Sequence, residues 1–170
     1  MKVILYMAIS ANGFIARKDD DVPWSGSIFA CYYDFVRKRG NIILGKRTYK
    51  IMKEVGEFEK LGFPLTVVVS DSPDKINNEK TIFVSSPKEA IKNLEERGVE
   101  EAIVGGGSIL NSSFMAENLI DEIYLDVEPI IFGEGIPLFA AGDFEKKLEL
   151  IEIKNISDNE IQLHYRVKRA

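Results

Sequence analysis

The sequence predicts an α/β fold whose central sheet is mixed and mostly parallel, and three observations support this. Runs such as Lys2–Ser10 and Leu65–Val69 are apolar almost throughout, as strands buried on both faces are. Segments with apolar residues at helical spacing alternate with these runs. The chain then ends in two strand-like segments around Ser157-Asp158-Asn159, which indicate a C-terminal antiparallel hairpin at one end of the sheet.

The first helix is expected over Ser27–Lys38, with Ser27 as its N-cap and Gly40 at its end. Its apolar side chains recur at helical spacing and would form one face: Ile28, Phe29, Tyr32, Phe35 and Val36. The polar, acidic loop before it contains Trp24, which we expect to cover an apolar surface.

The later elements alternate in type. Helices are expected at 48–55, 86–97 and 108–117, and strands at 14–16, 41–44, 81–84, 102–104, 122–131, 148–156 and 161–167. Ser86, Pro87 and Glu89 make a favourable helix start. Pro129 marks an edge or a bulge in its strand.

Composition narrows the possible functions. With 170 residues, a single domain over 1–170 is expected. A net charge of -5 without a basic block argues against nucleic acid as a partner. One cysteine and one histidine argue against a disulfide, a zinc site or a Ser-His-Asp triad. The chain shows neither a signal peptide nor an apolar run of the ~20 residues that a membrane span needs, so we expect a cytoplasmic protein without membrane contact.

Two strand-to-helix junctions are rich in glycine. Gly105-Gly106-Gly107-Ser108 follows one buried strand, and Gly45–Thr48 follows another and adds Lys46 and Arg47. The start of a helix presents unpaired N–H groups and a positive dipole end, which suit a phosphate. Ser70 ends a third strand at the same edge. The pattern favours a dinucleotide held by two helix ends; the alternatives are tight turns without a ligand and a solvated pair of cations.

Five motifs then occur in an order that resembles the dihydrofolate reductase-like superfamily, in particular its riboflavin-biosynthesis reductase branch. They are MAISANGFIA from Met7, VPW and ILGKRTY from Val22 and Ile43, VVVSDSP from Val67, IVGGGSIL from Ile103, and IYLDVEPIIFGEGIPLF from Ile123. The resemblance spans nearly the whole chain and implies a three-layer αβα domain.

The resemblance also implies NADPH as the cofactor. Ala8 and Ile15 would hold the nicotinamide carboxamide, and Ala16 would line the ring. Phosphates would lie at Gly45, Lys46, Arg47 and Thr48, with Lys46 near the 2′-phosphate and Ser70 at the adenosine end. Gly105 and Gly106 would form a cis peptide, and Gly107, Ser108 and Ile109 would contact the pyrophosphate. Asp71 disfavours NADPH relative to NADH, because a carboxylate repels the 2′-phosphate that only NADPH carries. Related proteins pair through edge strands, so a homodimer through the hairpin with Tyr165 and Val167 is expected.

The substrate implied is a flat pyrimidine- or pterin-like heterocycle that accepts hydride, the nearest activity being 5-amino-6-(5-phosphoribosylamino)uracil reduction. Phe29 stands where dihydrofolate reductases carry an acidic residue, which argues against folate reduction. Tyr6 and Asn12 replace the usual Lys and Asp of the riboflavin branch. Asp126 and Tyr6 are the candidate catalytic residues, and Trp24, Phe29 and Val104 the candidate substrate contacts. The alternatives are a dihydrofolate reductase and a non-catalytic nucleotide-binding protein.

Overall fold

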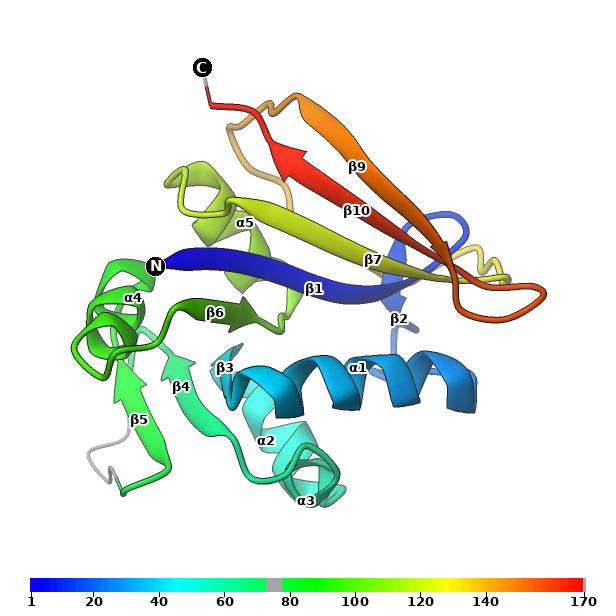
Figure 1. Cartoon of the computed structure of the whole chain (residues 1–170). Helices are drawn as coiled ribbons and strands as arrows, with labels where there is room; N and C mark the ends of the chain where they lie inside the picture. Colours follow the sequence, from blue (N-terminus) through cyan, green and yellow to red (C-terminus); the bar gives the residue numbers. More distant parts are fainter. Residues whose placement is uncertain (73–77, 170) are drawn as a thin grey trace.

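The computed structural model describes residues 1–72 and 78–169 and centres on an eight-stranded sheet (Figure 1). The strand order is β5-β4-β3-β6-β1-β7-β10-β9. The six strands from β5 to β7 are mutually parallel, while β10 is antiparallel to both β7 and β9. The strands of this sheet are β1 (Lys2–Ser10), β3 (Asn41–Gly45), β4 (Leu65–Val69), β5 (Thr81–Val84), β6 (Glu101–Val104), β7 (Glu122–Glu128), β9 (Leu148–Asn155) and β10 (Ile161–Val167).

Helices cover both faces of the sheet, which confirms the predicted three layers. They are α1 (Gly26–Arg39), α2 (Lys46–Glu54), α3 (Glu57–Lys60), α4 (Pro87–Glu95) and α5 (Ser108–Ala116). One face packs with α1 to α3 around Ile4, Tyr6 and Ile42. The other packs with α4 and α5 around Leu5 and Phe114. Accordingly, α1 and α5 lie on opposite sides of β1 in Figure 1.

Several predicted boundaries shift for local reasons. Ser25, not Ser27, caps α1, since its Oγ accepts a hydrogen bond from the Ile28 N–H at 3.2 Å. Gly45 is already the N-cap of α2, so this helix begins at Lys46 rather than Thr48. Strand β7 ends at Glu128, because Pro129 has no N–H to continue the ladder. The prediction that Gly40 ends α1 is confirmed, with φ at 66°.

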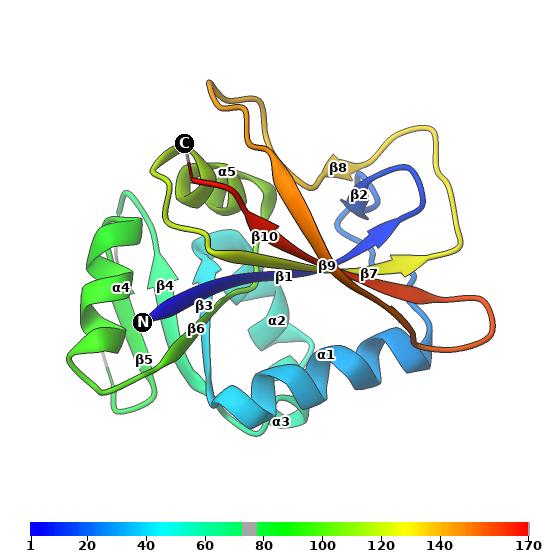
Figure 2. The same cartoon turned by 45° about the horizontal axis from the view of Figure 1, so that its top comes forward.

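A small second sheet pairs two loops over the end of β1. Strand β2 (Phe14–Ala16) is antiparallel to β8 (Ile136–Pro137), and Figure 2 shows them together, apart from the main sheet. Gly135 lies so close to this pair that a Cβ there would stand 2.7 Å from the Ala16 carbonyl oxygen. Asn12 donates from Nδ2 to the Phe132 carbonyl at 2.8 Å, so it joins the same two loops.

The C-terminal hairpin differs from its expected role at one point. Val167 is 8% exposed and belongs to the core, and Tyr165 packs against that core, so neither forms an outer surface. The apolar side chains exposed on the hairpin belong instead to the edge strand β9: Leu148, Leu150, Ile151 and Ile153. Separately, no helix within the described ranges is long and apolar enough to cross a bilayer.

Candidate active site

A cavity of about 650 Å³ opens at the carboxyl ends of β1, β3 and β6. Ala8, Gly45 and Gly105 line it from these strand ends, and Ile15, Ala16 and Ile136 line it from the small second sheet. This is the edge of a parallel sheet at which α/β proteins bind ligands. The chain leaves β1 through α1 toward β3 on one face of the sheet, and it leaves β6 through α5 toward β7 on the other face.

Two helices point uncapped N-termini at this cavity. The N-caps of α2 and α5 are Gly45 and Gly107, and neither helix has a side-chain hydrogen bond at its start. In contrast, serines cap α1 and α4. The first-turn N–H groups of α2 and α5 therefore have no capping side chain, and such groups attract anions.

Ser108 adds an unsatisfied polar atom at the same place. It is the first residue of α5, it lines the cavity, and its residue is 9% exposed. Its Oγ is buried and has no hydrogen-bond partner in the structure. A buried hydroxyl without a partner costs about 1–3 kcal/mol, so a ligand that satisfies it would gain that amount. Ser108 and the two uncapped helices thus fit a phosphorylated cofactor.

The glycine triplet brings the two junctions into contact. The Gly45 N–H donates to the Gly106 carbonyl at 2.8 Å, and the Gly105 N–H donates to the Ile43 carbonyl at 2.9 Å. A Cβ at Gly105 would lie 2.7 Å from Ile42 Cδ1 and 3.0 Å from Leu44 Cδ2, so a larger residue there would have to displace these two buried side chains. The cis peptide joins Gly106 to Gly107, and its predicted position at Gly105-Gly106 is wrong by one residue.

The cavity's positive charge lies at the start of α2. Among its described lining residues, the cations are Lys46 and Arg47. Lys46 Nζ donates to the Ser72 carbonyl at 2.9 Å, which joins α2 to the loop after β4. Arg47 forms an ion pair with Asp20. Ser70 itself does not line the cavity, although its neighbours Val69 and Asp71 do. Pro73, the end of the VVVSDSP motif, lies outside the described residues.

The other half of the cavity is apolar and aromatic. Its walls come from the loop before α1, from α1 itself, from α2 and from the start of α3. Trp24 and Phe29 line it, as predicted, together with residues that sequence reasoning missed: Val22, Ile28, Tyr32, Ile51, Met52, Val55 and Glu57. Val104 is fully buried and does not line it. Ile51 and Val55 are four residues apart and therefore share one face of α2, so the helical periodicity of the sequence could have identified them as lining residues.

Tyr6 and Asp126 form a buried polar pair beside this apolar half. The Tyr6 hydroxyl donates to Oδ2 of Asp126, and Gln162 Nε2 donates to Oδ1 at 2.7 Å. Tyr6 lines the cavity, whereas Asp126 lies behind it with 0% exposure. Burial raises the pKa of Asp126 to about 6, although the hydrogen bonds from Tyr6 and Gln162 act in the opposite direction. Burial, followed by the nearby Asp126 charge, raises the pKa of the Tyr6 hydroxyl well above its usual value.

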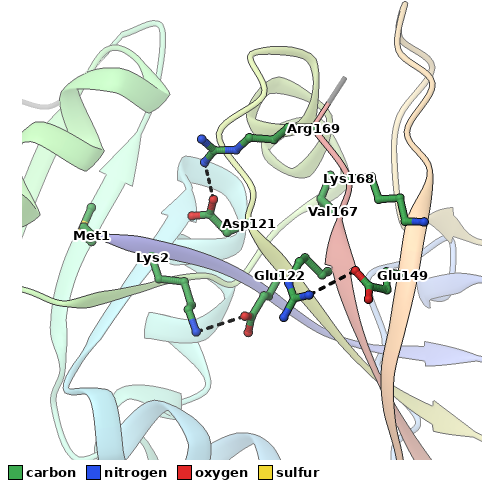
Figure 3. Close-up of a pocket in the computed structure, with 9 residues that line it drawn as sticks. Met1, Lys2, Asp121, Glu122, Glu149, Val167, Lys168 and Arg169 are labelled. Carbon is green, nitrogen blue, oxygen red and sulfur yellow. Dashed lines mark hydrogen bonds and ion pairs between the residues drawn. The ribbon is translucent and has the colours of Figure 1, made fainter.

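A second hollow, at the other end of β1, carries paired charges instead (Figure 3). Three ion pairs line it. Lys2 Nζ lies 3.1 Å from Glu122 Oε1, and Arg166 Nη1 lies 3.2 Å from Glu149 Oε2. Arg169 Nη2 lies 2.6 Å from Asp121 Oδ1. These three ion pairs neutralise one another's charges, so they leave little net charge for a ligand. Within the described residues, no cluster of histidine, cysteine and carboxylate side chains could hold a metal ion.

Comparison with known proteins agrees with this geometry. The chain matches the RibD C-terminal domain family over residues 1–162. It is 33% identical over 170 residues to the uncharacterized protein YwjB of Bacillus subtilis (strain 168), covering 96% of this chain and 97% of that protein. It is 27% identical over 129 residues to dihydrofolate reductase type 1 of Escherichia coli, covering 76% of this chain and 78% of the reductase.

The fold also matches a crystal structure from Shewanella sp. PV-4, of a protein provisionally assigned to riboflavin biosynthesis. The TM-score is 0.83 at 22% identity, with 99% of this chain and 100% of the other covered. These likenesses support a reductase of the dihydrofolate reductase-like superfamily. Its sequence and fold together show that the chain belongs to the RibD C-terminal domain family.

Proposed function

We propose that this protein is an NADPH-dependent reductase, a single domain that transfers hydride to a flat heterocycle. One observation carries the proposal: two uncapped helix N-termini and the unsatisfied Ser108 hydroxyl line one cavity whose remaining wall is aromatic. NADPH, when bound, supplies the hydride. The chain's residues would bind and orient it and would exclude water from the reacting atoms.

Most of the residues expected for the cofactor line the cavity, although Gly106 and Ser70 do not. Ala8, Ile15 and Ala16, which line it, would contact the nicotinamide. The first turns of α2 and α5, with Gly107, Ser108 and Ile109, would hold the phosphates. Lys46 and Arg47 support NADPH over NADH, while Asp71 on the same wall disfavours a 2′-phosphate.

The proton that accompanies the hydride would come through Tyr6 and Asp126. Tyr6 borders the substrate half of the cavity, and its hydroxyl is hydrogen-bonded to a carboxyl group whose pKa of about 6 leaves roughly a tenth of it protonated at pH 7. Asp126 would act from behind Tyr6 and would not touch the substrate. In this arrangement the proton source would lie on the strand β1, because Phe29 on α1 cannot donate a proton.

The test is direct, because Trp24 is the chain's single tryptophan and lines the cavity. Titration with NADPH should change its fluorescence and saturate. Consumption of NADPH absorbance in the presence of pyrimidine or pterin acceptors would then establish the activity. Binding without turnover on any flat heterocycle would favour a non-catalytic nucleotide-binding protein instead. Absence of binding would contradict both functions.

A homodimer through β9 is the second part of the proposal. All eight residues of this edge strand are exposed, and Leu150 and Ile153 are 50% and 57% exposed. If a second copy pairs antiparallel about an axis between Ile151 and Glu152, Leu150 faces Ile153 and Glu149 faces Lys154. Both pairs occur twice, while Ile151, where the pairing of β9 with β10 shifts register, would face Glu152 at the axis.

A further inference from the structure

The wall that α3 adds to the apolar half of the cavity carries a charged side chain, Glu57. It is the first residue of α3, it lines the cavity, and its residue is 9% exposed. The side chains next to Glu57 also end in polar groups, the hydroxyls of two tyrosines. The Tyr33 hydroxyl hydrogen-bonds to it, and its charge acts on the hydroxyl of Tyr32, which lines the same cavity. An otherwise apolar pocket therefore ends in a carboxylate beside phenol groups.

Glu57 keeps acceptor capacity for a ligand. Lys60 Nζ lies 3.6 Å from Glu57 Oε2, but the Lys60 side chain is 54% exposed and does not line the cavity. An ionised carboxylate accepts about four hydrogen bonds, and Tyr33 and Lys60 account for only part of this capacity. The remaining acceptor sites suit N–H donors of an aromatic edge.

The same half lacks the groups that a phosphorylated substrate needs. Among the described residues that line the cavity, the cations Lys46 and Arg47 both lie in the first turn of α2, where the cofactor phosphates are proposed. A phosphate beside Glu57 would meet a like charge in a half-enclosed apolar pocket, where charge repulsion is stronger than in water. Recognition of phosphate normally requires arginine, lysine or clustered N–H groups.

We propose that the substrate is a flat aromatic heterocycle that presents N–H donors to Glu57 and carries no phosphate. This inference deepens the proposed function, on which it rests for the division of the cavity into cofactor and substrate halves. It separates this protein from an enzyme for a ribose-phosphate pyrimidine. Phe29 and Trp24 would hold the ring by stacking, and Glu57 would fix which edge points inward.

The experiment compares four probes that share one ring: benzamidine, benzamide, benzoate and phenyl phosphate. Each is titrated calorimetrically into the whole protein, with and without NADPH. Benzamidine should bind most tightly and the two anions most weakly. Glu57→Gln should weaken benzamidine by roughly 10-fold or more, the usual effect of losing a charged hydrogen bond. Glu59→Gln, on the exposed side of the same helix, is the matched control and should change nothing.

The outcomes separate the two proposals. Equal or tighter binding of benzoate or phenyl phosphate, unchanged benzamidine affinity in Glu57→Gln, or no binding of any probe would each overturn the inference about the substrate. The probe order in the unaltered protein needs no variant, so a folding defect in Glu57→Gln cannot hide the result. Failure of NADPH to bind, with the probe order intact, would instead contradict the cofactor half of the proposed function.

Discussion

The hydroxyl of Tyr6 donates a hydrogen bond to a carboxyl group, that of Asp126, which the fold buries completely. The two residues lie on adjacent parallel strands, β1 and β7, and Gln162 on β10 donates to both. A carboxylate in such a place is stabilised by its donors and destabilised by the loss of water. Burial has the larger effect, so the pKa of Asp126 rises to about 6.

Asp126 should therefore make the protein less stable as pH rises from about 4 to about 6. In that window the folded chain holds a proton on Asp126 that the unfolded chain, with a pKa near 3.8, has lost. Across this window the free energy of unfolding falls by about 3 kcal/mol because of Asp126. Above and below the window, Asp126 adds no further pH dependence. Urea unfolding across pH should show that Asp126→Asn lacks this decline.

Glu160→Gln is the control, because Glu160 should change the stability with pH in the opposite direction to Asp126. Hydrogen bonds from Ser157, Ser25 and Ser27 lower the pKa of the Glu160 carboxyl, so its stabilisation is present above the ordinary glutamate pKa and is lost as pH falls. Its removal should weaken the protein at neutral pH more than in acid. If the two variants shift the stability profile in the same direction, the buried state of Asp126 is not as described.

Tyr6→Phe should raise the pKa of Asp126 further. The phenol hydrogen bond is one of the interactions that favour the ionised carboxylate, so its loss leaves burial less opposed. The upper end of the pH window of declining stability should rise by a measurable amount in the same urea experiments, while its lower end stays near the unfolded pKa of 3.8. Tyr124→Phe is the matched control, because Tyr124 is the partner of Tyr6 in the strand register and its hydroxyl makes no contact with Asp126 in the described hydrogen bonds. An equal shift in both variants would contradict a specific Tyr6 contact.

The sequence predicted the residues that line the strand-end wall of this cavity better than those of the aromatic wall, and the reason is physical. Glycines at Gly45 and Gly107 mark backbone turns, and the backbone itself makes that wall, so the pattern of residues sufficed. Tyr6 and Asp126 were predicted as separate candidates, and their hydrogen bond was not predicted, because it depends on β1 and β7 being neighbours in the sheet. Glu57 was missed because α3 has only four residues and no period to read. Val104 was placed in the site because it precedes the triplet, yet its side chain points into the core.

Ser108→Ala should weaken NADPH binding. The Ser108 hydroxyl has no partner inside the protein, so a phosphate oxygen is its proposed partner, and a hydrogen bond to a charged group contributes about 1.5–3 kcal/mol. The dissociation constant, followed through Trp24 fluorescence, should rise roughly 10-fold to 100-fold. Ser112→Ala tests a serine of the same helix that does not line the cavity and whose hydroxyl already donates to the Ala140 carbonyl at 2.8 Å, and it should bind NADPH normally. Unchanged affinity in Ser108→Ala would remove Ser108 from the cofactor site.

Lys46→Met should reduce the preference for NADPH over NADH. Lys46 reaches from α2 to the loop after β4, where the adenosine end is expected, and a 2′-phosphate there would lie near its ammonium group. NADPH affinity should fall by roughly 2-fold to 5-fold, as for a partly solvated charge pair, while NADH affinity stays constant. The effect should shrink as salt is added, because salt screens exposed charges. Equal losses for both cofactors would indicate a structural role for Lys46 instead.

Ile153→Glu should convert the proposed dimer into a monomer. In the register described for β9, Ile153 faces Leu150 of the second copy, so a glutamate would place a charge in the apolar contact twice per dimer. Light scattering should give twice the chain mass of 19.2 kDa for the unaltered protein and the single mass for the variant. Glu152→Gln, at the neighbouring exposed position, should remain dimeric. Because β9 lies at the edge of the sheet, far along the strand order from β3 and β6, the variant should still bind NADPH. A monomeric unaltered protein would refute the pairing outright.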